Sequence, residues 1–239
     1  MPSTDAEPPG TDPSKTGQKA GTESTKPSPA DGRRTLRTSS HDFEDTMGML
    51  RRKTPKNTSS LHTVLRTGSI AELEQHYSPS FVNYDGYPGA TLLTTALGNS
   101  DPSSRVALAH RLLDDGADVT RHAPLHVLLG QNAHDPEPEA ELLARLLDAG
   151  ADVNHAVPDV GTPLETIAKK FKFSDADNQP FYDVLLARPD IDFLAPGLDG
   201  RPVLVNLRKW YALRGHLVEQ VEAVLNRRGI TAPPEPVDD

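Results

Sequence analysis

Two segments of eight residues are nearly identical and lie 34 residues apart in the chain. Leu112–Val119 has the sequence LLDDGADV, and Leu146–Val153 has the sequence LLDAGADV. A fixed period of about 33 residues is typical of proteins built from stacked structural repeats. One repeat cannot bury its own apolar face, so about three or more neighbouring repeats are needed to form a stable core. The sequence therefore predicts a solenoid.

Helical signals surround both copies. Apolar residues recur at helical spacing over 106–113 and 142–147, and Gly116 and Gly150 then supply the left-handed residue that ends a helix. A proline follows soon after each copy, at a position where its missing N–H costs no helical hydrogen bond. We expect the next helices to begin at Ala123–His126 and Thr162–Glu165, with Thr162 as the cap.

These segments resemble the ankyrin repeat. That motif joins a Thr-Pro-Leu-His helix start, a Gly-His turn, a second helix ending in Leu-Leu, and Gly-Ala-Asp-Val-Asn. The resemblance covers about 59–229, with helix starts expected near residues 59, 91, 123, 162 and 201. It includes Gly215–Leu217 as the turn of the last unit. The fold class is predicted to be all-α: an ankyrin-like solenoid of about five helix-turn-helix units with a disordered N-terminal tail.

Four regions are expected along the chain. Residues 1–40 have a single large apolar residue, Leu36, and are predicted to be a disordered tail. Residues 41–58 carry a helical stripe that either caps the first repeat or docks on a partner, followed by a linker. Residues 59–230 form the ankyrin-like repeat domain, and 231–239 form a disordered acidic tail.

Composition excludes several classes of protein. The 239 residues contain no cysteine, which excludes a disulfide scaffold, a cysteine-ligated zinc module and a thiol nucleophile. No apolar run approaches the roughly 18 residues of a membrane span, so no membrane interaction is expected. The first 30 residues are polar, without the apolar segment of a signal peptide, and we therefore expect a cytoplasmic protein.

The net charge of −9 resides in the second part of the chain. Before residue 58, Lys and Arg number 10 and Asp and Glu 8, whereas the corresponding numbers from residue 58 onward are 15 and 26. Such a balance repels phosphate backbones, so nucleic acid is not an expected partner. The short basic runs at 169–172, 208–209 and 227–228 are interpreted as solvated helix ends.

No residue pattern indicates catalysis or cofactor binding. His122 and His126 have the four-residue spacing of metal ligands on a helix, but no third ligand stands in register. The resemblance implies instead that His126 bonds to backbone or capping groups. His134 and Glu139, in a turn expected to be lengthened over 131–140, are interpreted as part of a solvated acidic loop. A second lengthened turn is expected over 171–179. No catalytic, cofactor-binding or metal-binding residue is predicted.

With these classes excluded, the function that we expect is recognition of another protein. In the ankyrin family, hairpin tips and first helices form a concave surface that holds protein partners. Two aromatic pairs are further candidate contacts: Phe171 with Phe173, and Trp210 with Tyr211. Trp210 and Tyr211 are expected to lie in the first helix of the last unit and to pack in the core or the cap, and the length of that helix leaves room for one of them to be exposed. The residues predicted to contact a partner are Tyr84, Asp85, Tyr87, Arg121, His122, His155, Val157, Asp159, Phe193 and Leu194.

The predicted function is therefore a non-catalytic protein-binding module, and the chain is expected to be a monomer. The alternative is a toxin-neutralising (immunity-type) or regulatory inhibitor that acts on a basic partner, which the acidic charge would suit.

Overall fold

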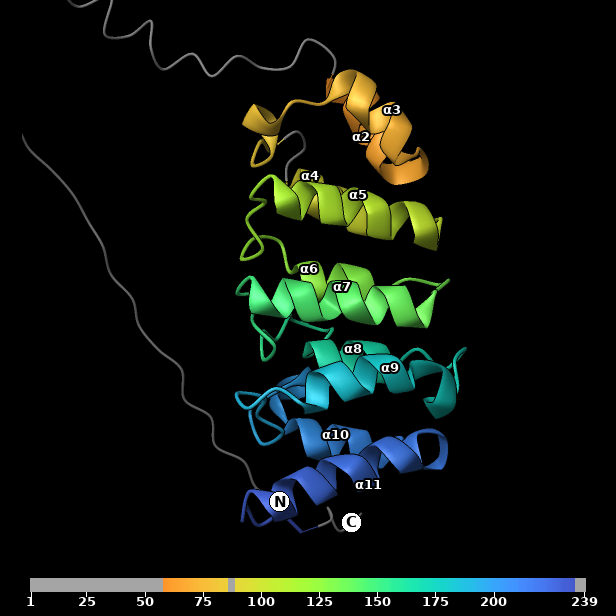
Figure 1. Cartoon of the computed structure of the whole chain (residues 1–239). Coiled ribbons are helices and arrows are strands. Elements are labelled where there is room, and N and C mark those ends of the chain that lie inside the picture. The colour runs from red at the N-terminus through yellow and green to blue at the C-terminus, as the bar shows by residue number, and fades with distance from the viewer. Residues whose placement is uncertain (1–57, 86–88, 235–239) are drawn as a thin grey trace, which may run out of the picture. The chain divides into compact units, whose positions relative to one another are not determined.

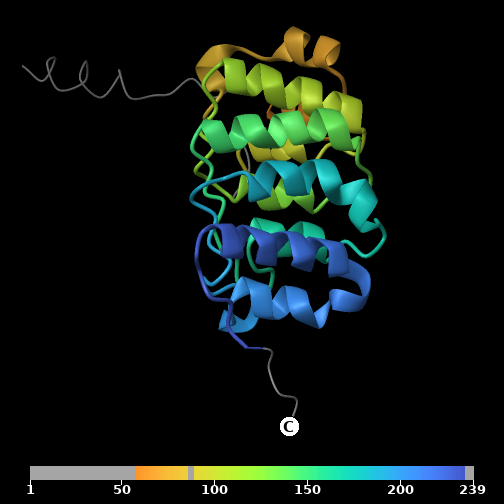
Figure 2. The ribbon, with the colours of Figure 1, turned by 60° about the horizontal axis from the view of Figure 1, so that its bottom comes forward.

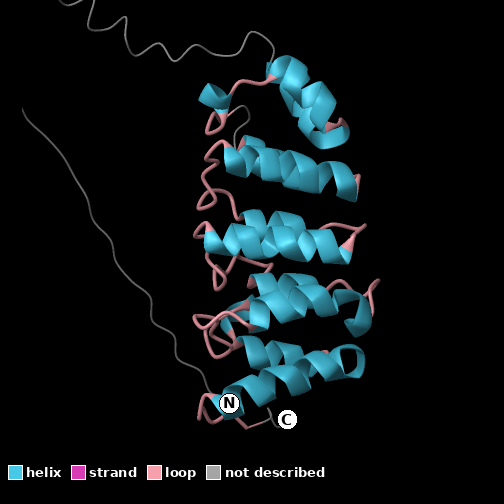
Figure 3. Ribbon diagram, in the orientation of Figure 1, coloured by secondary structure: helices cyan, strands magenta, loops and turns pink. Residues whose placement is uncertain are grey.

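The computed structural model describes residues 58–85 and 89–234, which belong to one compact unit, Lys53–Asp239. Within those two ranges the regular structure is helical (Figure 3), and two isolated β-bridges join Val157 to Gly161 and Pro196 to Pro202. The all-α class is thus confirmed. The predicted tail over 1–40, the stripe within 41–58, Tyr87 and residues 235–239 lie outside the described residues.

The described chain contains ten α-helices and two short 3-10 helices. The α-helices follow one another as five pairs: α2 (Thr58–Thr67) with α3 (Ile70–His76), α4 (Leu92–Leu97) with α5 (Pro102–Asp114), α6 (Pro124–Leu129) with α7 (Pro136–Asp148), α8 (Pro163–Ala168) with α9 (Asp175–Leu186), and α10 (Val203–Lys209) with α11 (Tyr211–Arg227). The 3-10 helices are η1 (Pro79–Phe81) and η2 (Leu198–Gly200). None of the described helices is both long and apolar enough to cross a membrane.

The helix pairs pack on one another in chain order (Figures 1 and 2). The first helices of the pairs form one ladder, in which α2, α4, α6, α8 and α10 each contact the next. The second helices, α3, α5, α7, α9 and α11, form a parallel ladder. Leucine side chains fill the space between the two ladders, and the buried apolar residues form one continuous cluster.

Local signals place the helix ends where the sequence predicts them. The first helices begin at residues 58, 92, 124, 163 and 203, within two residues of the expected starts. Thr162 caps α8 by accepting a hydrogen bond from the Glu165 N–H, and Pro163 occupies the first helical position. Gly116 and Gly150 have φ of +85° and +104°, a backbone conformation that favours glycine.

Two predicted turns are shorter than expected. The expected long turns over 131–140 and 171–179 end early, because α7 already begins at Pro136 and α9 at Asp175. Pro136 suits a first helical turn, and Ser174 caps α9 in a capping box with Asp177.

The predicted turn at Gly215–Leu217 instead lies inside α11. This helix begins at Tyr211 and bends at Arg214, whose φ is −133°. Trp210 therefore ends α10, and Tyr211 lies in the second helix of its pair, not in the first as predicted, with 54% of its surface exposed.

A buried ion pair replaces the solvated acidic loop that the sequence suggested. Glu139 on α7 is fully buried, and one of its carboxylate oxygens pairs with the guanidinium of Arg105 on α5. Its other oxygen accepts hydrogen bonds from His134 Nδ1 at 2.8 Å and from the Asp135 N–H at 3.0 Å. Arg105 also donates to the carbonyl of Ala133 at 3.1 Å. This network joins two neighbouring helix pairs.

Asparagine side chains make a second type of link between pairs. Asn83 donates from Nδ2 to the Gly116 carbonyl at 3.1 Å and accepts from the Asp118 N–H at 2.7 Å. Asn154 repeats this geometry on the carbonyl of Asp190, at 2.7 Å, and the N–H of Asp192, at 2.8 Å. Both asparagines follow a valine at the same place in their repeats, so the same side chain links two different sets of neighbouring pairs.

We expect Glu139→Leu to destabilise the chain by roughly 3–5 kcal/mol, because the substitution leaves the buried Arg105 guanidinium without its carboxylate. The double variant Arg105→Met/Glu139→Leu should recover much of that loss, since no unpaired charge remains buried. Urea unfolding followed by circular dichroism measures both effects. Asp114→Asn, which breaks the exposed pair with Arg145, serves as the control and should have a much smaller effect. A Glu139→Leu variant as stable as this control would contradict the assignment.

Asn154→Ala should lower the free energy of unfolding by about 1 kcal/mol, because two hydrogen bonds between pairs are lost at a partly exposed site. The matched control is Thr120→Ala. Thr120 occupies the equivalent place in the preceding repeat, and its hydroxyl donates only to nearby Asp118, at 2.7 Å. Thermal unfolding of the two variants makes the comparison, and equal losses would show that the link between pairs contributes nothing.

Candidate binding groove

The five first helices present equivalent positions along one face. Counting from Ser59, Thr91, Ala123 and Thr162, the residues at the fifth and eighth positions line cavities on this face. The same count in the last pair starts at Arg201. The eighth position changes in character along the ladder. It is occupied in turn by Arg66, Gly98, Gly130, Lys169 and Arg208. Two glycines thus lie between cationic residues.

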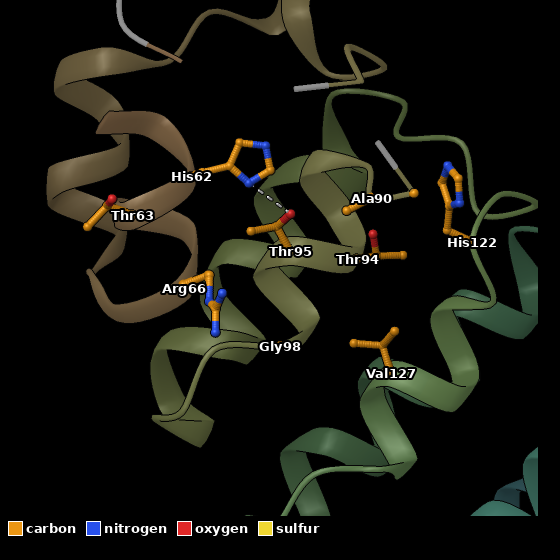
Figure 4. A pocket seen from close by; sticks show the side chains of 10 residues that line it. His62, Thr63, Arg66, Ala90, Thr94, Thr95, Gly98, His122 and Val127 are labelled. Carbon is orange, nitrogen blue, oxygen red and sulfur yellow. Dashed lines mark hydrogen bonds between the residues drawn. The ribbon is translucent and has the colours of Figure 1, made fainter. Parts of the chain in front are cut away.

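One cavity, of about 570 Å³, lies across α2, α4 and the beginning of α6. Figure 4 shows His62 and Arg66 on one side of it, Thr94 and Thr95 in the middle, and His122 and Val127 on the other side. His62 Nδ1 lies 3.3 Å from Thr95 Oγ1. Burial, reinforced by the nearby Arg66 cation, lowers the pKa of His62. The imidazole is therefore kept neutral to a lower pH than usual.

A second cavity, of about 460 Å³, lies across α6 and α8. It shares the lining residues His122 and Val127 with the first cavity, so the two cavities adjoin. Its remaining lining combines apolar side chains with two cations, as listed: Ala123, His126, Gly130, Val157, Val160, Thr166, Lys169 and Lys170. We call the two cavities together the groove.

Two lysines of the groove correct the expectation that residues 169–172 form a solvated helix end. Lys169 and Lys170 are only half-exposed and line the second cavity. Lys169 Nζ donates to the Val160 carbonyl at 2.6 Å, and Lys170 Nζ to Asn132 Oδ1 at 3.2 Å. Burial lowers the pKa of Lys170. The signal that could have identified Lys169 is its eighth position, shared with Arg66.

His126 connects α6 to the next helix pair. Its Nε2 donates to the Gly161 carbonyl at 2.9 Å, which confirms the expected bond to backbone. The edge of its ring packs against His155, with 5.9 Å between ring centroids. Burial is the main cause that lowers the pKa of His126, while the hydrogen bond to Gly161 acts in the opposite direction.

Glu165 occupies in α8 the position that His126 has in α6. Its buried carboxylate accepts hydrogen bonds from the Thr162 N–H at 2.7 Å, from Asn206 Nδ2 at 2.7 Å and from the Leu198 N–H at 3.1 Å. A Cβ on Gly197 would collide with this carboxylate. Glu165 thus holds the following loop, which contains Gly197 and Leu198, against α8 through hydrogen bonds from neutral donors.

The structure gathers some of the predicted contact residues at the groove. His122 lines both cavities and Val157 the second one, while His155 lines a smaller cavity of about 200 Å³ beside His126. Asp85 and Arg121 form an ion pair between two neighbouring hairpin tips.

The other predicted residues are placed differently. Tyr84 and Leu194 are half-buried, and Asp159 is exposed with φ of +61°. Phe193 is not available for contact, contrary to the prediction. Only 1% of its surface is exposed, and the centre of its ring lies 5.7 Å from the Arg228 guanidinium carbon. The Leu204 N–H donates to the Phe193 carbonyl at 2.9 Å, which ties this hairpin to α10. Phe193 therefore belongs to the core.

Two aromatic residues considered for binding lie beyond the groove residues. Phe171 is 50% exposed and packs edge-on against Trp210, with ring centroids 6.1 Å apart. Phe173 is half-buried beside His134, at 5.2 Å between centroids. No group of three or more His, Asp or Glu side chains suited to hold a metal ion occurs in the described part of the chain.

Comparison with known proteins bears on the fold alone. No protein-family model matches the chain, and no curated protein matches it either. A solved structure, that of a functionally unknown protein from Leptotrichia buccalis, is similar with a TM-score of 0.54 at 13% sequence identity. The similarity covers 72% of this chain and 96% of that protein. The helical arrangement therefore also occurs in a bacterial protein of very different sequence.

Acidification should destabilise the chain through its buried histidines. Because the folded-state pKa of His126 lies below the usual 6.5, the unfolded chain binds more protons in the pH interval just below that value. The free energy of unfolding should therefore fall as the pH decreases through 6.5, and His126→Gln, which keeps an N–H donor, should reduce this fall. Some dependence will remain, since burial also lowers the pKa of His62 and His110. Urea unfolding at pH 7.5 and 5.5 tests this, and an unchanged pH dependence would refute it.

Proposed function

We propose that the chain is an ankyrin-like repeat protein of five helix pairs that binds a protein partner without catalysis. The pairwise stacking of helices supports the repeat assignment, as do the equivalent asparagine links of Asn83 and Asn154. The observation that carries the binding function is the groove, whose two adjoining cavities together span four first helices and share His122 and Val127.

The form of the groove suits a segment of polypeptide. Gly98 lines the first cavity and Gly130 the second, and neither carries a side chain, so a partner's backbone can approach closely at both places. Val127, Val157 and Val160 provide apolar contact, and threonine hydroxyls and lysines provide polar contact. Protein interfaces combine an apolar centre with a polar rim in this way.

Val127→Trp should block the groove, because Val127 lines both cavities and the indole would occupy their junction. We expect the affinity for a partner to fall by about tenfold or more, equivalent to ~1.4 kcal/mol. The partner is first isolated with the full chain by affinity capture and mass spectrometry, and its affinity is then measured by calorimetry. The matched control is Ala176→Trp, at an exposed position of α9.

The hairpin tips are tested separately by Tyr84→Ala, since Tyr84 is partly exposed and aromatic side chains contribute much of the energy at interfaces. A loss of ~1 kcal/mol or more would place Tyr84 in the contact. If neither Tyr84→Ala nor Val127→Trp weakens the complex, the partner does not use this surface and the proposed function is wrong.

A further inference from the structure

Charge is divided between the two ladders of helices. The first helices, α2, α4, α6, α8 and α10, contain a single acidic residue, Glu165, and its carboxylate is buried. The second helices α3, α7 and α9 are rich in Asp and Glu. The groove is built on the first helices. Its local charge therefore differs from the strongly negative net charge of the whole chain.

The cations of the groove lack the carboxylate partners that several other cations have. Arg111, Arg121, Arg145 and Arg188 lie outside it, and each forms an ion pair with an Asp or Glu side chain. In the groove, Arg66, Lys169 and Lys170 have no carboxylate within ion-pair distance among residues 58–85 and 89–234. Uncompensated positive charge therefore lies at both ends of the groove.

We propose that the groove binds an acidic segment of the protein partner in an extended conformation, an inference that rests on the proposed function. Its carboxylates would meet Arg66 at one end and Lys169 and Lys170 at the other, where charge-assisted hydrogen bonds are stronger than neutral ones. Its apolar side chains would pack on Val127, Val157 and Val160 between these cations.

The charge distribution favours this occupant over two others. A basic partner, which the net charge alone would suggest, would place its cations against Arg66 and Lys169. A nucleic acid would bring phosphates close to the exposed carboxylates of Asp152 and Asp159 in the loop before α8. A peptide can alternate acidic and apolar side chains to match the groove. A nucleic acid carries a phosphate charge at every nucleotide and offers no such alternation.

The test uses the full chain as bait for a displayed library of random peptides, and the enriched peptides are then measured by fluorescence anisotropy. Arg66→Glu/Lys169→Glu reverses the charge of the groove. Arg201→Glu/Arg227→Glu reverses the same charge at two exposed positions outside it and is the matched control. Circular dichroism and thermal unfolding verify that both variants are folded.

We expect the enriched peptides to be rich in Asp and Glu and to bind the wild type and the control with similar affinity. Binding to the groove variant should be at least about tenfold weaker, and the wild-type affinity should fall as salt is raised, because screening weakens ion pairs between partners.

The other outcomes overturn this inference in distinguishable ways. Neutral or basic peptides that bind the wild type but not Val127→Trp would leave the proposed function intact and refute the acidic partner. Acidic peptides that bind the groove variant equally well would show that the cations of the groove are not the contact. A labelled single-stranded oligonucleotide that binds the wild type but not the groove variant would favour nucleic acid. Failure to enrich any peptide would count against both proposals.

Discussion

The burial of leucine between neighbouring helix pairs is the interaction on which the rest of the structure depends. The first helices α4, α6 and α8 have six residues each, which is too short for a helix to persist alone in water. They are held because Leu97 and Leu128 are completely buried among the surrounding helices. A single pair offers no such enclosure, so its helices require the adjoining pairs.

Stacking also buries polar backbone groups, and long side chains from neighbouring pairs satisfy them. Asn99 donates to the Leu65 carbonyl at 3.0 Å, and both residues are buried. Arg214 donates to the Ala168 carbonyl at 2.7 Å, although it comes from the last helix of the chain. Unsatisfied buried carbonyls would cost about 1–3 kcal/mol each, so these side chains also stabilise the stack.

Helix ends, which depend on residues close together in the sequence, could be predicted from the sequence. Gly116 and Thr162 act through their own backbone and near neighbours, and so the helix ends were predictable. The partnership of Arg105 and Glu139 was not, because the two residues are 34 positions apart and Glu139 lies in an acidic stretch that is solvated in most proteins. The groove was half-predicted: hairpin residue His122 was identified from the resemblance, whereas Arg66 required alignment of the eighth position across all five pairs.

Neighbour-to-neighbour packing has a consequence for how a partner would affect the chain. Within the described part, each substantial helix contact joins helices of one pair or of adjacent pairs, so α2 and α8 communicate only through the intervening helices. A segment that bridges Arg66 and Lys169 would tie these separate parts together directly. Local unfolding of the first helix pair would then also require this segment to dissociate, so the bound segment would stabilise the N-terminal end of the stack.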